Sequence, residues 1–584
     1  MSKKLKKALL QLFLFFLLSC AFSCANIVAP TGGPIDVTPP KIKKSEPPNH
    51  SPNFTGDKIR ITFDEYVFLE DQANQIVVSP PTDKAFDFDI NGKSVVVSLL
   101  EDLQDSVTYT IYFGESIKDI TENNPLRNFE FSFSKSNILD SLSMQGRVFD
   151  ALTLDPQPGI FVMLYSSDDD SVPVKSKPGY ITKTSADGSF ILKNLAKKKY
   201  KIFALKDMNA DMQFNQPNEL IAFADSMLSP QYISTGIDTV RSKKDSSSAK
   251  QDSLYLPEQI RTTDLYLFYQ PDTIQKLLKV RTDAFHQFKL VFKHPVKNLN
   301  IQVSNKDLPE NWKIEEYSKT KDTITCWVYD TQLDTLKCRF TDSGFLIDTA
   351  EIVLKKISGN QKPVKKPSGK GLGFEEEADK LSITTNAASG KLPYFLPLKF
   401  TLGRPVSKTD FSKIILEEKT DSIFNVVQPE GIFEDTVYKR AYILKYKWIS
   451  SGSYRIKILP GAYTDMYGQI NDSLIGMFTV SRPEDYGRLL FTLKQNESGK
   501  KYLVQLLKED KSLLEQKQVD KSGQIIFNNL GPANYMIRIV NDLNNNNKWD
   551  EGDYFKRRQP EPVIYFPNVI NIRANWDTEY EFVL

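Results

Sequence analysis

Side chains that carry oxygen are concentrated in one stretch near the C-terminus, "NDLNNNNKWDEGDY", residues 541–554. Counted from the first aspartate, they fall at positions one, three, five, nine and twelve, and a lysine whose backbone carbonyl would suffice takes position seven: Asp542, Asn544, Asn546, Asp550, Asp553 and Lys548. This is the ligand spacing of a calcium-binding loop. Calcium requires six to eight hard oxygen ligands, and the nitrogen and sulfur ligands preferred by zinc or copper are absent. The pattern predicts a structural Ca²⁺ site.

The loop departs from a helical calcium loop in ways that weaken the predicted site. The entering segment "YMIRIV" has the pattern of a buried strand, and Asp553 takes the place of a longer glutamate. Asn547 holds the sixth position, where glycine is usual, and asparagine also tolerates the left-handed conformation. With three carboxylates, the expected dissociation constant is about 10⁻⁴–10⁻³ M. The alternative is a polar loop whose Asp and Asn side chains bond their own backbone.

The same pattern occurs earlier in the chain, at a constant offset of 335 residues, as from Asp207 to Asp542. No gap is needed from Gly188 through Asn218, and Asn194 meets Asn529. The earlier loop supplies a second, weaker set of predicted calcium ligands, with Asn215 and Asn218 at the ninth and twelfth places and Glu219 one step beyond: Asp207, Asn209, Asp211 and Gln213. A repeat of this kind indicates two copies of one module.

Short strands must position these loops. Runs such as "KIRITF", "KSVVVSL" and "FEFSFS" alternate apolar and polar residues and are separated by turns such as "INGK". The 584 residues are too many for one core. We therefore predict an all-β, multidomain chain of β-sandwiches. The formal net charge of +2 gives no bulk reason to expect a nucleic-acid partner.

Two module types are indicated by resemblance. The sequence around "ITFDE", "TYTI", "IKDITENNPL" and "FEFSFS" resembles bacterial Ig-like domains of S-layer and cell-surface proteins, and "MQGRVFDALTLDPQPGIFVMLYSS" with "TKTSADGSFILKNLAKKKYKIFALKD" resembles prealbumin-like domains found beside carboxypeptidases. The predicted order is an Ig-like domain at 39–137, a prealbumin-like domain at 142–240, a flexible linker at 241–257, a β domain at 258–357 for which an Ig-like fold is one option, a linker at 358–379, an Ig-like domain at 380–482, and a second prealbumin-like domain at 487–584.

The N-terminus has the pattern of a signal peptide, residues 1–24, followed by a Pro/Gly-rich tether at 25–38. "LLSC" ending at Cys20 resembles a bacterial lipobox, and "AFSC" ending at Cys24 is a weaker match, so we favour lipidation at Cys20 over Cys24. The alternative is an ordinary signal peptide with two incidental cysteines. The C-terminal run from "YMIRIV" onward also resembles the closing domain of Bacteroidetes Ig-like lipoproteins. The resemblance implies a lipid-anchored outer-membrane protein, and we favour the periplasmic face because no acidic run directly follows either cysteine.

Two further cysteines, Cys326 and Cys338, lie in "TITCWVYDTQLDTLKCRF". They are equidistant from Gln332, so a hairpin with its tip there would place them opposite each other, within disulfide range. The alternative is a pair of small apolar residues on a sheet face.

Catalytic motifs are absent from the sequence, and the three histidines, His50, His286 and His294, stand apart from any nucleophile pattern. We therefore predict a non-catalytic envelope protein of structural, adhesive or scaffold type. One alternative is an accessory partner in envelope transport or assembly. Another is a glycan-binding surface protein, in which aromatic side chains of "YFPNVINIRANWD" stack on sugars.

Overall fold

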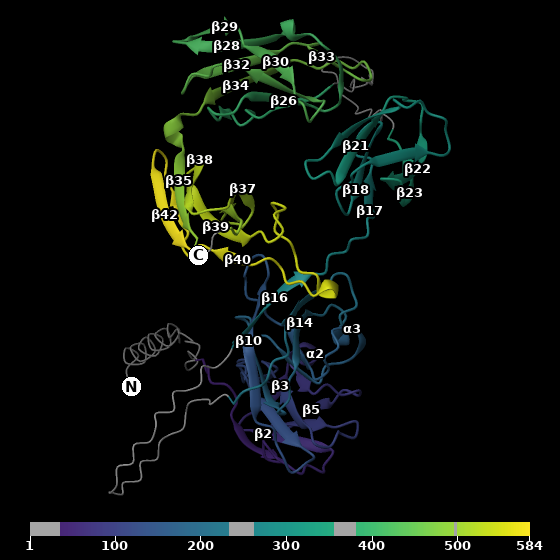
Figure 1. Ribbon diagram of the computed structural model, residues 1–584, viewed down its shortest axis with the longest axis vertical. Helices are drawn as coiled ribbons and strands as arrows, with labels where there is room; N and C mark the ends of the chain where they lie inside the picture. The colour runs from purple at the N-terminus through teal and green to yellow at the C-terminus, as the bar shows by residue number, and fades with distance from the viewer. Residues whose placement is uncertain (1–34, 233–261, 356–380, 496–498) are drawn as a thin grey trace, which may run out of the picture. The chain divides into compact units, whose positions relative to one another are not determined.

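The computed structural model describes residues 35–232, 262–355, 381–495 and 499–584 (Figure 1). The predicted signal peptide with Cys20 and Cys24, the linkers 241–257 and 358–379, and most of the tether 25–38 lie outside the described residues. Strands dominate, and every helix within these ranges has three or four residues. This confirms the all-β, multidomain fold class. Among the described residues, no helix has the length and apolar character that a membrane crossing requires.

The described residues form two compact units. The first runs to Gln270 and also contains the segment Asp553–Arg558, whereas the second comprises Pro271–Gly552 and Gln559–Leu584. Each unit contains more than one sandwich.

The first sandwich of the first unit has two sheets, ordered β1-β2-β6-β5 and β4-β7-β9, and a ribbon β3-β8. In β2, every second side chain is fully buried, as the alternating pattern of "KIRITF" predicts. Its elements are β1 (Ile42–Glu46), β2 (Lys58–Phe63), β3 (Val67–Leu69), α2 (Gln72–Gln75), β4 (Val77–Ser79), β5 (Asp87–Asn91), β6 (Ser94–Ser98), β7 (Thr108–Tyr112), β8 (Ile117–Asp119) and β9 (Glu130–Ser134).

The second sandwich of this unit has strand order β12-β11-β14-β15-β16-β10-β13. Its elements are β10 (Leu142–Asp150), β11 (Phe161–Tyr165), α3 (Val172–Lys175), β12 (Tyr180–Lys183), β13 (Ser189–Leu195), β14 (Lys201–Lys206), β15 (Leu220–Phe223) and β16 (Thr262–Tyr269). Strand β16 pairs in parallel with β10, although the sequence analysis assigned residues 258–357 to the following domain. That boundary was wrong, and in the structure it follows Gln270.

The second unit begins with a sandwich of two sheets, β17-β18-β21-β20 and β19-β22-β23. Its strands are β17 (Leu277–Arg281), β18 (Gln287–Phe292), β19 (Leu299–Val303), β20 (Lys313–Tyr317), β21 (Thr323–Val328), β22 (Thr335–Asp342) and β23 (Phe345–Val353). The predicted β21–β22 hairpin is wrong, because these two strands belong to different sheets. Cys326 and Cys338 are free thiols within one apolar core, which agrees with the alternative of two small apolar residues.

The next sandwich has sheets β24-β26-β31-β30 and β25-β34-β32-β28-β29, with a ribbon β27-β33. Its elements are β24 (Ile383–Thr385), β25 (Lys391–Leu392), β26 (Leu398–Leu402), β27 (Val406–Thr409), η1 (Phe411–Lys413), β28 (Ile414–Thr420), β29 (Ile423–Val427), β30 (Gly431–Glu434), β31 (Ala441–Lys445), β32 (Ser453–Ile458), β33 (Tyr463–Asp465) and β34 (Leu474–Val480). Ribbons β3-β8 and β27-β33 both end at a buried aspartate, Asp119 or Asp465, that accepts hydrogen bonds from the backbone of the following turn.

The last sandwich repeats the pairing of the second one. β35 pairs with β38 and, in parallel, with β42, as β10 pairs with β13 and β16; β36 and β39 pair as β11 and β14 do. This confirms the internal repeat at the level of strand pairing. Its elements are η2 (Pro483–Asp485), β35 (Gly487–Lys494), β36 (Tyr502–Lys508), β37 (Leu513–Val519), β38 (Gly523–Leu530), β39 (Ala533–Asn541), η3 (Tyr554–Lys556), β40 (Val563–Tyr565), β41 (Ile570–Ile572) and β42 (Asp577–Val583).

Candidate functional site

The C-terminal polar loop leaves strand β39 at a buried aspartate. Asp542 is only 2% exposed, and its two carboxylate oxygens accept hydrogen bonds from the backbone of Asn546 (3.1 Å) and Asn547 (3.0 Å). Asn547 has φ of 62°, the left-handed conformation that its position in the loop predicts. The chain therefore curls back over the Asp542 carboxylate directly after the strand.

Asp550 closes the same loop from its far end. One carboxylate oxygen of Asp550 accepts hydrogen bonds from the side-chain amides of Asn544 (2.5 Å) and Asn546 (2.6 Å). The side-chain oxygen of Asn546 accepts from the backbone N–H of Lys548 (2.8 Å). The structure thus brings together four of the predicted side-chain ligands, Asp542, Asn544, Asn546 and Asp550.

Asp553 has hydrogen-bond partners of its own. Its side chain accepts from the amide of Gln270 (2.9 Å) and pairs with the ammonium of Lys556 (3.1 Å). Burial pushes the pKa of the Asp553 carboxyl upward, but the hydrogen bonds from Gln270 and Lys556 outweigh it and the pKa lies below its usual value. The Asp553 carboxylate is therefore engaged by other partners, and its role as the closing ligand stays a prediction.

Glu561, which the sequence does not single out, adds a third carboxylate to this loop. Glu561 is 5% exposed, and its carboxylate accepts the backbone N–H groups of Leu543 (2.8 Å) and Asp550 (3.1 Å). Burial is the largest cause of a raised pKa at Glu561, and with repulsion from Asp550 and Asp542 it outweighs the two donors. The carboxylates of Asp542 and Asp550 therefore lie close enough to Glu561 to raise its pKa.

The first copy is built in the same way. Asp207 accepts from the backbone of Asn209, Ala210 and Met212. Glu219, fully buried, accepts from the backbone of Met208 (3.4 Å), Asn215 (2.9 Å) and Gln216 (3.0 Å). With the offset of 335, Met208 falls on Leu543 and Asn215 on Asp550, which are the donors to Glu561. Glu219 and Glu561 are therefore equivalent residues.

The other predicted ligands of the first loop also lie together. One oxygen of Asp211 accepts from the side-chain amides of Asn209 (2.9 Å) and Asn215 (2.5 Å), and the other accepts from the backbone N–H of Gln213 (2.8 Å). In both loops, then, aspartates and asparagines are bonded to one another and to the loop backbone.

In both loops, the side-chain oxygens of Asp and Asn accept hydrogen bonds from the backbone of the same loop, as the alternative of a polar loop without a metal predicts. Within the described ranges, no group of three or more His, Cys, Asp or Glu side chains is arranged to hold a metal ion. The calcium site stays a prediction.

After the loop, the offset between the two copies changes from 335 to 342. The strand pairing shows this change: Phe203 pairs with Phe223 in the first copy, and the equivalent pair in the second copy is Arg538 with Tyr565. Seven residues are therefore inserted in the second copy, between Asp553 and Glu561. They contain the short helix η3 and belong, in part, to the first compact unit.

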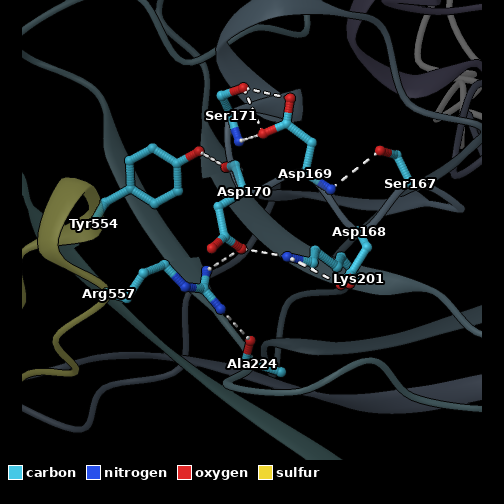
Figure 2. A network of polar contacts seen from close by, with 9 residues as sticks. All are labelled: Ser167, Asp168, Asp169, Asp170, Ser171, Lys201, Ala224, Tyr554 and Arg557. Carbon is cyan, nitrogen blue, oxygen red and sulfur yellow. Dashed lines mark hydrogen bonds and ion pairs between the residues drawn. The ribbon is translucent and has the colours of Figure 1, made fainter.

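Within that unit, the inserted segment is bound to the second sandwich (Figure 2). The Tyr554 hydroxyl donates to the backbone carbonyl of Asp170, whose carboxylate pairs with Lys201 and, at 3.4 Å, with Arg557. The Arg557 guanidinium also lies over the ring of Phe223, 4.4 Å from its centroid. Burial raises the pKa of the Tyr554 hydroxyl. These contacts are structural, since every ionisable group named here has a charged or hydrogen-bonding partner.

A cleft of about 970 Å³ in the first unit lies between its two sandwiches. Its lysines are engaged: Lys193 pairs with Glu130 at 2.8 Å, and the Lys183 ammonium donates to the backbone carbonyl of Asn74 at 2.5 Å. Both lysines that line the cleft therefore have acceptors within the first unit.

Comparison with known proteins identifies one of these domains. Residues 36–135 match the family model of the bacterial Ig-like domain. The match covers the first sandwich and agrees with the predicted range of 39–137. No curated protein is significantly similar to the chain.

Alignable solved structures have low similarity. They include the major pilin subunit BcpA of Bacillus cereus (9% identity, TM-score 0.15, covering 76% of this chain and 99% of that chain). The S-layer protein rSbsC aligns with 10% identity and a TM-score of 0.12, covering 86% and 65%. The TIE protein of Bacillus anthracis aligns with 8% identity and a TM-score of 0.15, covering 95% and 75%.

Proposed function

We propose that this chain is a non-catalytic, lipid-anchored component of a bacterial cell envelope with a structural, adhesive or scaffold role. The observation that carries the proposal is a series of β-sandwiches that begins with a bacterial Ig-like domain. The lipobox-like "LLSC" and "AFSC" support an anchor at Cys20 or Cys24 in the outer membrane, as in the Bacteroidetes lipoproteins that the sequence resembles. A multiply acylated cysteine would anchor the chain stably.

The test is membrane fractionation and intact-mass analysis of the mature chain, in Cys20→Ser and Cys24→Ser variants. One variant is expected to lose the acyl mass and leave the membrane fraction, while the other behaves as the parent. An unacylated parent chain would refute the anchor. Protease treatment of intact cells then decides the face, and survival of the chain is expected for the periplasmic face.

We also propose that the C-terminal loop binds calcium weakly, with Glu561 rather than Asp553 as the closing carboxylate. The support is the gathering of Asp542, Asp550 and Glu561 at one loop, together with two asparagine side chains. Calcium would require the asparagine amides to turn their oxygens inward, which exchanges the hydrogen bonds to Asp550 for metal ligands.

Calorimetry of the full chain tests this site. With a dissociation constant of about 0.5 mM, about 5 mM calcium stabilises the module by about 1.4 kcal/mol. The expected rise of its melting transition over a chelator control is about 5–10 °C. Asp542→Ala with Asp550→Ala should abolish the rise, and Asp520→Ala, which removes an exposed carboxylate of the same module, should retain it. Identical parent melting curves in calcium and chelator would refute the site.

A further inference from the structure

Both prealbumin-like modules contain a β-bulge at the same place. Strand β13 has one extra residue within 192–195 relative to its partner β10, and strand β38 has one extra residue within 527–530 relative to its partner β35. The bulges contain Asn194 and Asn529, equivalent through the offset of 335, at φ of 57° and 56°. A bulge re-aims a side chain away from the regular pleat, and asparagine tolerates the left-handed conformation better than most residues.

In the first copy, the bulged asparagine reaches the preceding Ig-like domain. The Asn194 amide nitrogen donates to the hydroxyls of Thr110 (2.9 Å) and Ser132 (2.8 Å), on strands β7 and β9. These two side chains are 1% and 0% exposed, so one amide group donates hydrogen bonds to two buried hydroxyls. Buried polar groups left without a partner cost free energy, so the contact favours one placement of the module on the sandwich.

In the second copy, the equivalent asparagine also reaches the Ig-like domain that precedes it. The Asn529 side-chain oxygen accepts from the Tyr394 hydroxyl at 2.7 Å. The Tyr394 ring lies in an aromatic cluster with Phe395, at 5.2 Å between centroids, and with Tyr486, at 5.9 Å, which lies just before β35. The chemistry of the contact differs from that in the first copy, but the position of the asparagine and the type of neighbouring domain are the same.

We propose that each Ig-like domain and the prealbumin-like module after it form one rigid two-domain unit, present twice in this chain, and that the bulged asparagine fixes the module on its sandwich. The asparagine is a positioning residue, and its partner is the set of hydroxyl groups that the Ig-like domain presents. Around Asn194 the junction is reinforced by the Lys193–Glu130 pair and by the backbone N–H of Ile181, which donates to the Ser79 hydroxyl at 3.0 Å. The proposal is independent of the lipid anchor and of calcium.

Hydrogen–deuterium exchange of the full chain, read by mass spectrometry, tests the first junction. The backbone N–H groups of Ile181 and Lys193 donate to side chains of the Ig-like domain, so their exchange reports docking. Asn194→Gly keeps the left-handed backbone and removes the amide. Peptides covering 180–183 and 191–195 should then exchange about tenfold faster, with core strands unchanged. The control is Asn123→Gly, an exposed asparagine with φ of 63°.

The second junction has its own variants. Asn529→Gly and Tyr394→Phe should both speed exchange of peptides covering 392–396 and 484–488, whereas Asn575→Gly, at an exposed left-handed asparagine, should not. A response at only one junction would overturn the claim of a repeated unit.

A second variant of the first junction leaves the bulge intact. Thr110→Val with Ser132→Ala removes the hydroxyls from the Ig-like side, and it should deprotect the same peptides as Asn194→Gly. If Asn194→Gly unfolds the module throughout, this double variant decides the matter. Exchange equal to that of the Asn123→Gly control would overturn the role of the asparagine.

Discussion

Removal of the Glu219 carboxylate should open the first polar loop. Two of its three hydrogen bonds, from the backbone of Asn215 (2.9 Å) and Gln216 (3.0 Å), have good length, and the third, from Met208, is long at 3.4 Å. Hydrogen bonds to a charged group contribute about 1.5–3 kcal/mol each. Asn215 is exposed and Gln216 is half-buried, so water replaces part of the loss. The lower limit applies, and Glu219→Ala should cost about 3 kcal/mol.

Exchange of backbone amides over residues 207–218 measures this cost in the full chain, where several domains make a single unfolding free energy undefined. A loss of about 3 kcal/mol corresponds to exchange about 100-fold faster, provided that local opening limits exchange. The strands of the sandwich that carries this loop, such as β11 and β14, should keep their protection.

Glu219→Gln removes the negative charge of the side chain and keeps its shape. The glutamine oxygen can still accept the two short hydrogen bonds, while its amino group faces the weak contact with Met208. The expected cost is about 1 kcal/mol, or exchange roughly fivefold faster. Glu122→Ala, at an exposed glutamate of the neighbouring domain, should leave the loop unchanged. If Glu219→Ala also exchanges within about twofold of the parent chain, the carboxylate does not hold the loop and the reasoning from hydrogen-bond length fails.

Two further outcomes follow from charge and burial. The hydrogen bond from Arg455 is the largest cause of a lowered pKa at Glu417, so the stability that this pair contributes is present above the usual value of 4.5 and is lost as pH falls through the lower folded pKa. Backbone amides of β28 and β32, which carry the two residues, should therefore lose more protection against exchange on acidification in the parent chain than in Glu417→Gln. Burial raises the pKa of Cys338 to about 11 and that of Cys326 well above its usual range. Both thiols should therefore resist iodoacetamide in the native chain and react with it after denaturation. A denatured chain that does not react would indicate a disulfide.

Much of the fold was predictable because strand periodicity is local. Alternation in "KIRITF" places Ile59, Ile61 and Phe63 on one face, and all three are fully buried. The repeat was predictable for a different reason: two copies of one pairing scheme keep the same apolar and turn positions, so similarity within the chain needs no outside reference.

The errors arose where pairing is decided by distant residues. "TITCWVYDTQLDTLKCRF" has two strands around a turn, but the turn near Asp330 carries the chain from one sheet to the other instead of folding it back within one. Local sequence does not distinguish a hairpin from such an arch. Strand β16 was misassigned for a similar reason, because its partner β10 lies more than a hundred residues earlier and pairs in parallel.

The closing glutamate was missed because ligand counting assumes a continuous loop. In the first copy, Glu219 lies one place beyond the counted twelve; in the second, the inserted residues move Glu561 out of register altogether. Only the hydrogen bonds to equivalent backbone donors show that the two glutamates correspond. The signal available in the sequence was that a glutamate follows both loops and directly precedes, within two residues, the next strand.

The position of the insertion also has a physical reason. It falls between the last residue of the polar loop and the glutamate that holds the loop, so its length can change while the hydrogen bonds from Leu543 and Asp550 to Glu561 are kept. Tyr554 and Arg557 within it make their contacts to residues of the first compact unit. The residues before Glu561 therefore form a closed loop, and the inserted residues can make contacts of their own while the hydrogen bonds that hold this loop are kept.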